Sequence, residues 1–255
     1  MNSADDYRKS IINAINDLSQ TMGPETIFRD WCECMSLSIA NSTDVAHSKK
    51  WEERESAYLR IADKYGDKAQ VFPHMFADLT NLLEIDTFND HLGRIYMELF
   101  RGNKNLGQCF TPISVCQMMA DTICHLPDDY PNPKRLPYTV GDESCGGGAT
   151  LLAAAESFYK QDKEFQKHIQ FHAQDLDRLC VHMCYVQLSL IGVRAIVRHA
   201  NTITQQVFDE FVSPMEVMAR ACMWDKFPVI RDEKTPEISE TVIESGRNPV
   251  QLSLF

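Results

Sequence analysis

A glycine cluster beside an acidic residue is the clearest chemical feature of this sequence. Residues 137–142 are prone to β-structure and end at Asp142, and Gly146, Gly147 and Gly148 follow shortly after. A turn from strand to helix needs glycine wherever the backbone must approach a ligand closely. Any tight turn of this kind also uses glycine without binding anything. The cluster therefore predicts a strand, a turn and a helix, and by itself leaves ligand binding open.

A carboxylate follows at a spacing that suits a nucleoside-containing ligand. Residues 169–175 form a second predicted strand, which ends at Asp175. In a doubly wound sheet, an acid at the end of the second strand accepts hydrogen bonds from ribose hydroxyls. Asp175 has that position. Asp177 points the other way if the strand continues, so we expect it in solvent or at the cap of the next helix.

The elements that must position these residues alternate between strand and helix. A helical pattern over 150–159 separates the first strand from the second. Another over about 179–191 separates the second from a third strand, predicted over 193–199. This order predicts an α/β fold with a parallel, doubly wound, Rossmann-like sheet and flanking helices. Prolines concentrated between residues 124 and 137 mark a surface connection that leads into the first strand.

The first hundred residues have a different pattern. From Tyr7 to about Phe100, apolar residues recur at helical spacing. We therefore expect a helical N-terminal domain over 1–104 and an α/β domain over 105–228. Residues 229–255 carry many charges and few apolar side chains, which predicts a disordered tail.

Charge and cysteine content limit the ligand classes. The formal net charge is -11, whereas a protein that holds DNA alone usually presents a basic surplus. A local basic patch, a partner that contacts the DNA, or a different ligand would account for this. The cysteines are scattered, so we expect reduced, mostly buried thiols and no metal. Neither a bilayer-spanning run nor a signal-peptide pattern occurs, which predicts a cytoplasmic protein without membrane contact.

Several segments, taken in order, resemble a known family. They read Gly-Gln-Cys-Phe-Thr-Pro at 107–112, Asp-Glu-Ser-Cys-Gly-Gly-Gly-Ala at 142–149, Ala-Gln-Asp-Leu-Asp at 173–177 and His-Ala-Asn-Thr-Ile-Thr at 199–204. In this order they resemble the modification subunits of type I restriction-modification systems, which are N6-adenine DNA methyltransferases of the gamma class. Residues 90–100 resemble the helix that leads into these motifs. The resemblance implies the S-adenosylmethionine-binding part of a class I methyltransferase fold.

The resemblance also implies which residues contact the cofactor. The 108–112 segment closes over its methionine end, Asp142 faces its amino group and Asp175 holds the ribose. The cofactor-binding residues implied are Gln108, Phe110, Thr111, Pro112, Asp142, Gly146, Gly147, Gly148, Ala149, Asp175 and Asn201. Glu143 replaces a proline of the family pattern and Gly147 a serine, and neither change removes a backbone donor.

The catalytic turn of that family is incomplete in this chain. The family uses Asn/Asp/Ser-Pro-Pro-Tyr/Phe/Trp, which stacks a flipped adenine and accepts hydrogen bonds from its exocyclic nitrogen. Ser213 and Pro214 stand where this turn is expected, but Met215 and Glu216 follow, and Pro-Pro occurs nowhere in the chain. Too few residues follow for the remaining strands of a complete fold. We therefore expect Ser213 and Pro214 to form a degenerate catalytic turn, in a shortened fold that does not methylate DNA alone.

The last five residues carry a second signal. Gln251, Leu252, Ser253, Leu254 and Phe255 follow a polar stretch. They resemble the motif by which bacterial replication and repair proteins bind the DNA polymerase sliding clamp. The resemblance implies that Gln251 enters a polar pocket and that Leu254 and Phe255 fill an apolar one. The alternative is a tail that folds back and buries Leu252, Leu254 and Phe255 on its own domain.

These features support three hypotheses about function. The first is a cofactor-binding, adenine-specific DNA methyltransferase-like protein that the sliding clamp recruits. The second is a working N6-adenine methyltransferase, completed by another subunit, that uses Ser213 and Pro214. The third is a non-enzymatic protein of DNA replication or restriction that uses the fold as a scaffold. We rank them in this order because the catalytic turn is half present.

Overall fold

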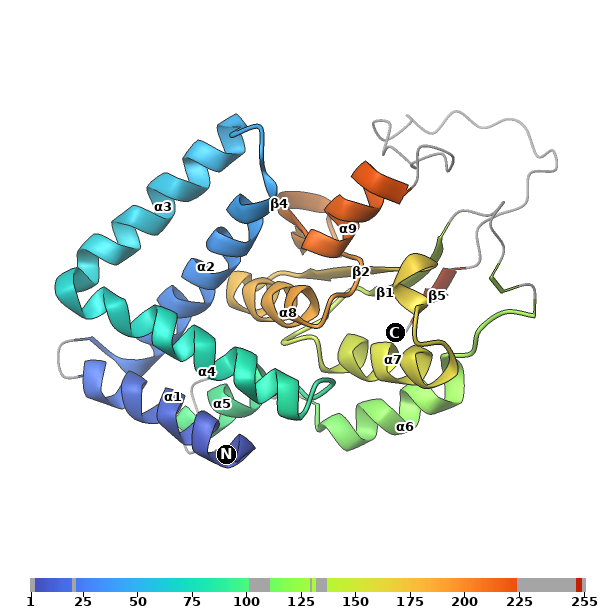
Figure 1. The fold of residues 1–255 in the computed structure, drawn as a ribbon, viewed down its shortest axis with the longest axis horizontal. Coiled ribbons are helices and arrows are strands. Elements are labelled where there is room, and N and C mark those ends of the chain that lie inside the picture. Colours follow the sequence, from blue (N-terminus) through green and yellow to red (C-terminus); the bar gives the residue numbers. More distant parts are fainter. Residues whose placement is uncertain are drawn as a thin grey trace.

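The structure, a computed structural model, describes residues 3–19, 22–100, 111–128, 130–131, 137–223 and 251–253. Helices occupy the left of Figure 1, and a sheet with its own helices occupies the centre and right. This arrangement confirms the predicted helical N-terminal region followed by an α/β fold. Within the described ranges, no helix is long and apolar enough to cross a membrane.

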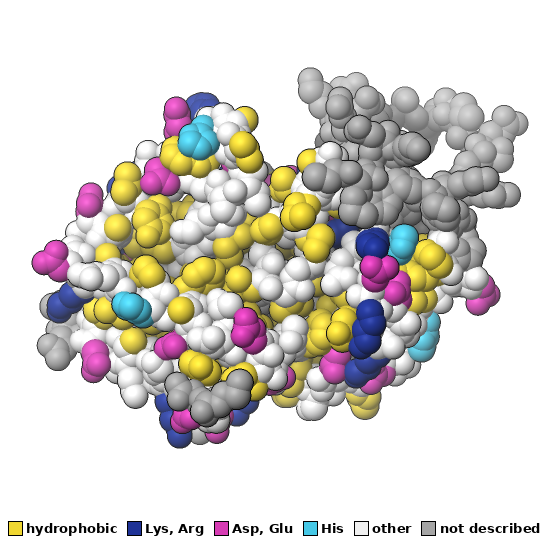
Figure 2. Space-filling model, in the orientation of Figure 1, with side chains coloured by type: hydrophobic (Ala, Val, Ile, Leu, Met, Phe, Trp, Pro, Cys, Tyr) yellow, Lys and Arg dark blue, Asp and Glu magenta, His cyan; other side chains and the backbone are white. Residues whose placement is uncertain are grey.

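Charged side chains of both signs are mixed on the surface. On the face shown in Figure 2, acidic and basic residues lie interspersed, with apolar side chains between them. On this face, the residues that the structure describes form no broad basic patch of the kind that holds a DNA backbone. The acidic net charge of -11 agrees with that distribution.

Caps and an apolar core account for the helical region. Its elements are α1 (Ala4–Leu18), α2 (Pro24–Thr43), α3 (Lys49–Tyr65), the short 3₁₀ helix η1 (Gly66–Gln70), α4 (Val71–Ile85) and α5 (His91–Leu99). Ser3 and Asp6 form a capping box at the start of α1, and Pro24 opens α2. The fully buried Trp31 donates from Nε1 to the Phe72 carbonyl at 3.3 Å, which joins α2 to α4.

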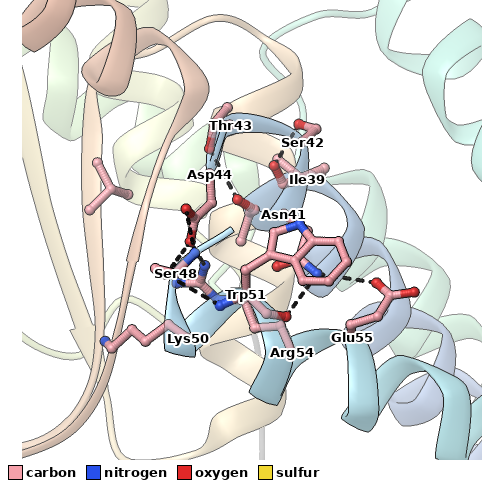
Figure 3. A network of polar contacts seen from close by, with 12 residues as sticks. Ile39, Asn41, Ser42, Thr43, Asp44, Ser48, Lys50, Trp51, Arg54 and Glu55 are labelled. Carbon is pink, nitrogen blue, oxygen red and sulfur yellow. Dashed lines mark hydrogen bonds and ion pairs between the residues drawn. The ribbon is translucent and has the colours of Figure 1, made fainter. Parts of the chain in front are cut away.

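A polar network shapes the turn between α2 and α3 (Figure 3). Ser48 caps α3 by accepting from Trp51 N, and the Asp44 carboxylate accepts from both the backbone and the hydroxyl of Ser48. Arg54 lies 3.8 Å from Asp44. Lys50 reaches toward the sheet, with its Nζ 3.7 Å from the carboxylate of Asp209. The network therefore sets the angle of α3 and brings its first turn beside the sheet.

The α/β region follows the predicted alternation. Its elements are α6 (Ile113–Ile123), β1 (Tyr138–Asp142), α7 (Ala149–Gln161), η2 (Phe165–Lys167), β2 (Ile169–Asp175), α8 (Arg178–Leu190), β3 (Ala195–Asn201), β4 (Gln206–Val212), α9 (Pro214–Met218), the π-helical turn η3 (Ala219–Met223) and β5 (Gln251–Ser253). The strand order is β4-β3-β2-β1-β5, and β1, β2 and β3 are parallel as predicted. β3 begins two residues later than predicted because Val193 N donates to Leu188 O and closes α8.

The sheet is apolar on one face only. Phe171 contacts Phe158 of α7, and Phe211 contacts Tyr185 of α8. The register places these two strand residues on the same face, so α7 and α8 cover the same side of the sheet. The half-exposed side chains of Gln170, His172 and Gln174 point to the other side. Glu216 of α9 contacts Gln170 and Arg194, so α9 lies at the amino end of β3 on that other side, opposite α7 and α8 (Figure 1).

β4 runs antiparallel to β3, which differs from the predicted all-parallel sheet. Only residues 202–205 separate the two strands, and a parallel crossover needs a dozen or more. Asn201 Oδ1 accepts from Ile203 N and Thr204 N, and Gln205 adopts φ 58°, so these residues close a tight turn. The end of β4 consequently lies at the amino edge of β3.

The last strand returns to the opposite edge of the sheet. β5 pairs in parallel with β1, and Val140 lies opposite Leu252. The remainder of the predicted tail over 229–255, Leu254 and Phe255 included, lies outside the described residues. The backbone of residues 251–253 thus lies against the chain's own domain.

A buried ion pair fixes α9 to the start of β3. Arg194 Nε lies 2.8 Å from Glu216 Oε2, and these side chains are 7% and 2% exposed. Arg220 Nε donates to the other Glu216 oxygen at 2.8 Å. Burial opposes ionisation of Glu216, but the hydrogen bonds from both arginines hold its pKa below the ordinary value. The pair therefore stays charged at neutral pH.

We predict that Glu216→Gln destabilises the fold, because it removes the buried carboxylate that pairs with the buried Arg194. The free energy of unfolding in urea should fall by about 3 kcal/mol. The matched control is Glu210→Gln, which removes an ion pair with the half-exposed Arg198 and should cost about 1 kcal/mol or less. Equal losses for the two variants would contradict the assignment of a buried, stabilising pair.

Candidate functional site

The glycine turn joins β1 to α7, and its backbone is fixed to the end of β2. Cys145 N donates to Gln174 O at 3.0 Å, and Gly148 N donates to Cys145 O at 2.8 Å. Gly146 N donates to Asp175 Oδ2 at 2.9 Å. The turn and the second predicted acid are therefore in direct contact, as the sequence spacing predicted.

A side chain would be crowded at two of the glycines. Gly148 adopts φ 96°, and a Cβ there would lie 3.1 Å from Cys184 Sγ. A Cβ on Gly147 would lie 3.1 Å from Asp90 Oδ1 and 3.2 Å from the terminal carbon of Met183. The turn is thus packed closely against both α8 and the start of α5, and Ala149 begins α7 directly behind it.

The carboxylates of Asp142 and Asp175 meet at the carboxyl edge of the parallel strands. Asp142 is 1% exposed, and its two oxygens accept from Ser144 N and from the Thr150 hydroxyl. Asp175 is half-buried and accepts from Gly146 N and from Asp177 N. Ligands of open α/β sheets bind outside this edge. Asp142 therefore shapes the turn from below, while Asp175 lies at its surface.

The turn after β3 completes the same edge. Thr202 Oγ1 donates to Glu143 O at 2.7 Å and accepts from Gln174 Nε2 at 2.9 Å. Asn201 sits at the end of β3, and its side-chain oxygen is used within its own turn. The structure therefore brings the glycine turn, Asp175 and Asn201 together, as the family resemblance implied.

A pocket of about 300 Å³ opens between α5 and α6, next to the glycine turn. It is lined by Asn89, Asp90, Gly93, Arg94, Met97, Thr111, Pro112 and Ile113. Two predicted cofactor residues, Thr111 and Pro112, are thus part of a concave site. The other two of that segment, Gln108 and Phe110, lie outside the described residues.

Asp90 and Gln187 were not among the predicted site residues, although both lie at its centre. Gln187 is fully buried, and its Nε2 donates to Asp90 Oδ1 at 2.9 Å and to Gly147 O at 2.8 Å. The residues around Gln187 in α8 are apolar, and a polar side chain in such a helix must find partners. A polar residue within the apolar sequence of α8 was therefore the signal that pointed to Gln187. The identity of the partners depends on contacts between residues far apart in the chain.

The candidate catalytic residues lie at the other end of the sheet. Ser213 is fully buried, donates to Val193 O at 2.7 Å and accepts from Ala195 N at 2.9 Å. It also caps α9, whose first residue is Pro214. β3 spans seven residues, so about 20 Å separates this turn from the carboxyl edge. The structure therefore does not bring Ser213 and Pro214 together with the glycine turn.

The described cysteines are free and buried, as expected. A hydrogen bond with Cys184 and burial raise the pKa of the Cys145 thiol well above its ordinary value, and burial raises that of Cys124 to about 11. These thiols are therefore neutral. Within the described ranges, no three histidine, cysteine or acidic residues are grouped to hold a metal ion.

Comparisons with known proteins identify a family. The chain resembles the type I restriction-modification system methyltransferase subunit from Streptococcus thermophilus at 14% identity, with a TM-score of 0.39. That match covers 79% of this chain, which spans 59% of the length of that subunit. No curated protein matches. The sequence model of the N-6 DNA Methylase family matches residues 87–235, which is more than half of the chain and includes the whole site described above. The chain belongs to the N-6 DNA methylase family.

Proposed function

We propose that this chain is an adenine-specific DNA methyltransferase-like protein that binds S-adenosylmethionine at the glycine turn. The observation that carries the proposal is the direct bond from Gly146 N to Asp175 Oδ2 at the carboxyl edge of β1 and β2. It combines a close backbone approach with a surface carboxylate, which is the pairing that holds an adenosine ribose in such folds. Asp175 would accept hydrogen bonds from the ribose hydroxyls of the bound cofactor.

Methyl transfer in this proposal requires a base pocket from another chain. The hydroxyl of Ser213 is fully engaged at the amino edge of β3, about 20 Å from the proposed cofactor turn. The carboxylate of Glu216, which replaces the aromatic ring of the family turn, is paired with Arg194. A flipped adenine needs a stacking face and a hydrogen-bond acceptor beside the methyl group. A partner subunit that contacts DNA supplies these groups and the positive charge that this chain lacks.

Cofactor binding by the intact chain is the direct test of this proposal. Isothermal calorimetry should detect binding of S-adenosylmethionine to the chain. Asp175→Ala should weaken this binding at least tenfold, because a hydrogen bond to a charged group contributes about 1.5–3 kcal/mol to the free energy. The matched control is Asp209→Ala, which removes a β4 carboxylate that pairs with Lys50 and should leave the affinity unchanged. Absence of binding at millimolar cofactor would sink the proposal.

Methyl transfer by the chain, alone and with a partner, tests where the base pocket comes from. The chain alone should incorporate no labelled methyl into unmethylated DNA, whereas a mixture with candidate partner subunits should, and Asp175→Ala should abolish that signal. Ser213→Ala should lower the melting temperature, because it removes three buried hydrogen bonds. Incorporation by the chain alone that disappears in a folded Ser213→Ala variant would show that Ser213 is catalytic.

The proposal also includes recruitment by the sliding clamp through residues 251–255. The support is the sequence of this segment together with its place in the fold. β5 is three residues long and lies at the edge of the sheet beside β1. A strand of three residues with one neighbour has few ladder hydrogen bonds to lose, so in this proposal it leaves the sheet edge and pairs with a partner instead.

Clamp recruitment is tested by a pull-down with purified clamp. Full-length chain should retain the clamp, and deletion of residues 251–255 should abolish retention without loss of S-adenosylmethionine binding. Double substitution of Leu254 and Phe255 by alanine should have the same effect while leaving the chain length unchanged. Retention by both variants would refute recruitment through this segment. A chain that binds the clamp but no cofactor would favour the non-enzymatic scaffold hypothesis.

A further inference from the structure

Asp90 is a buried carboxylate without a cationic partner. It is 6% exposed, and burial raises its pKa above the ordinary value. In the described part of the chain, no lysine, arginine or histidine forms an ion pair with it. The adjacent His91 bonds instead to the Asp86 carbonyl, and burial lowers the pKa of this imidazole. A charge held in this way is costly unless a cation arrives to balance it.

One oxygen of Asp90 remains available. Oδ1 accepts from Gly93 N and from Gln187 Nε2, both at 2.9 Å. Oδ2 accepts from no residue that the structure describes. A Cβ on Gly93 would lie only 2.1 Å from Oδ2, and one on Gly147 would lie 3.2 Å from it. Glycine at both positions therefore leaves room for Oδ2 of Asp90, and Asp90 lines the pocket between α5 and α6.

The pocket also contains a positive charge. Arg94 lies one turn after Asp90 and lines the same cavity of about 300 Å³, while Met97 and Ile113 add apolar surface. An anion and a cation across one small cavity are complementary to the ammonium and carboxylate of an α-amino acid. Asp142 is less suited to this ammonium group, because it is 1% exposed below the turn and is not among the residues that line the pocket.

We infer that the pocket binds the amino-acid end of the cofactor, with Asp90 accepting from its ammonium group and Arg94 donating to its carboxylate. This inference rests on the proposed function and deepens it. It transfers the contact with the amino group from Asp142 to Asp90. It also explains why a buried acid sits between two glycines at the contact of α5 with the glycine turn.

The test uses three ligands that differ only where the pocket acts. S-adenosylmethionine and S-adenosylhomocysteine both carry the amino-acid end, and 5′-methylthioadenosine lacks it. Asp90→Asn keeps a side chain that caps α5 well. In calorimetry this variant should bind the first two ligands at least tenfold more weakly and the third with unchanged affinity. Arg94→Gln should weaken the same two ligands by a smaller factor, because Arg94 is exposed. The charge-matched control is Asp121→Asn, an exposed carboxylate of α6, which should change none of the three.

A purely structural role for Asp90 has a different signature. Because the pKa of Asp90 is raised, its charge lowers the stability of the fold at neutral pH, and Asp90→Asn should leave the melting temperature unchanged or higher. Unchanged S-adenosylmethionine affinity, or an equal loss for 5′-methylthioadenosine with a lower melting temperature, would overturn the inference. If the wild-type chain binds 5′-methylthioadenosine but gains nothing from the amino-acid end, the inference fails while the proposed function stands. If it binds none of the three ligands, both fail.

Discussion

The side-chain amide of Gln187 joins the three parts of the molecule that make the site. Its Nε2 donates to Asp90 and to the carbonyl of Gly147, and its Oε1 accepts from Leu92 N at 3.1 Å. These bonds connect α8, the start of α5 and the glycine turn inside an apolar core. A buried amide that loses any of these partners leaves a polar group unsatisfied at a cost of about 1–3 kcal/mol. The helical region therefore cannot move away from the glycine turn without that cost, and the pocket between them keeps its shape.

The direction of β4 separates the proposed cofactor edge of the sheet from the candidate catalytic turn. The parallel strands β1, β2 and β3 bring Asp142, Asp175 and Asn201 to one edge. The short turn after Asn201 sends β4 back to the other edge, where Ser213 caps α9. The hydroxyl of Ser213, which stands in the candidate catalytic turn, makes hydrogen bonds with Val193, Ala195 and Glu216. In this geometry the proposed cofactor residues lie together at one edge of the sheet, and the candidate catalytic turn lies at the other.

Local patterns were sufficient to predict much of the fold. β1, β2, α7 and α8 follow from β-prone runs, glycine turns and helical spacing, all of which are properties of neighbouring residues. Gln170, His172 and Gln174 alternate with apolar residues, and they lie on the face of the sheet that α7 and α8 do not cover. The antiparallel direction of β4 was missed because the family resemblance supplied an order of motifs without their orientation. The length of the 202–205 connection was the signal that would have predicted it.

The sequence predicted site residues only where their positions follow from the spacing within one strand–turn–helix unit. The glycine turn and Asp175 depend on spacing within a βα unit, and the structure brings them together. Asp90 and Gln187 depend on a contact between residues that are 97 positions apart, which no local pattern encodes. Ser213 shows the opposite case, because its sequence neighbourhood resembles a catalytic turn while its hydrogen bonds are those of a helix cap.

The central claim is that the carboxyl edge beside the glycine turn is the cofactor site. A crystal structure of the chain with S-adenosylhomocysteine tests it most directly. The account predicts a ribose within hydrogen-bond distance of Asp175 and an amino-acid end in the pocket lined by Asp90 and Arg94. A ligand bound beside Ser213 at the amino edge of β3, or away from the glycine turn altogether, would contradict it.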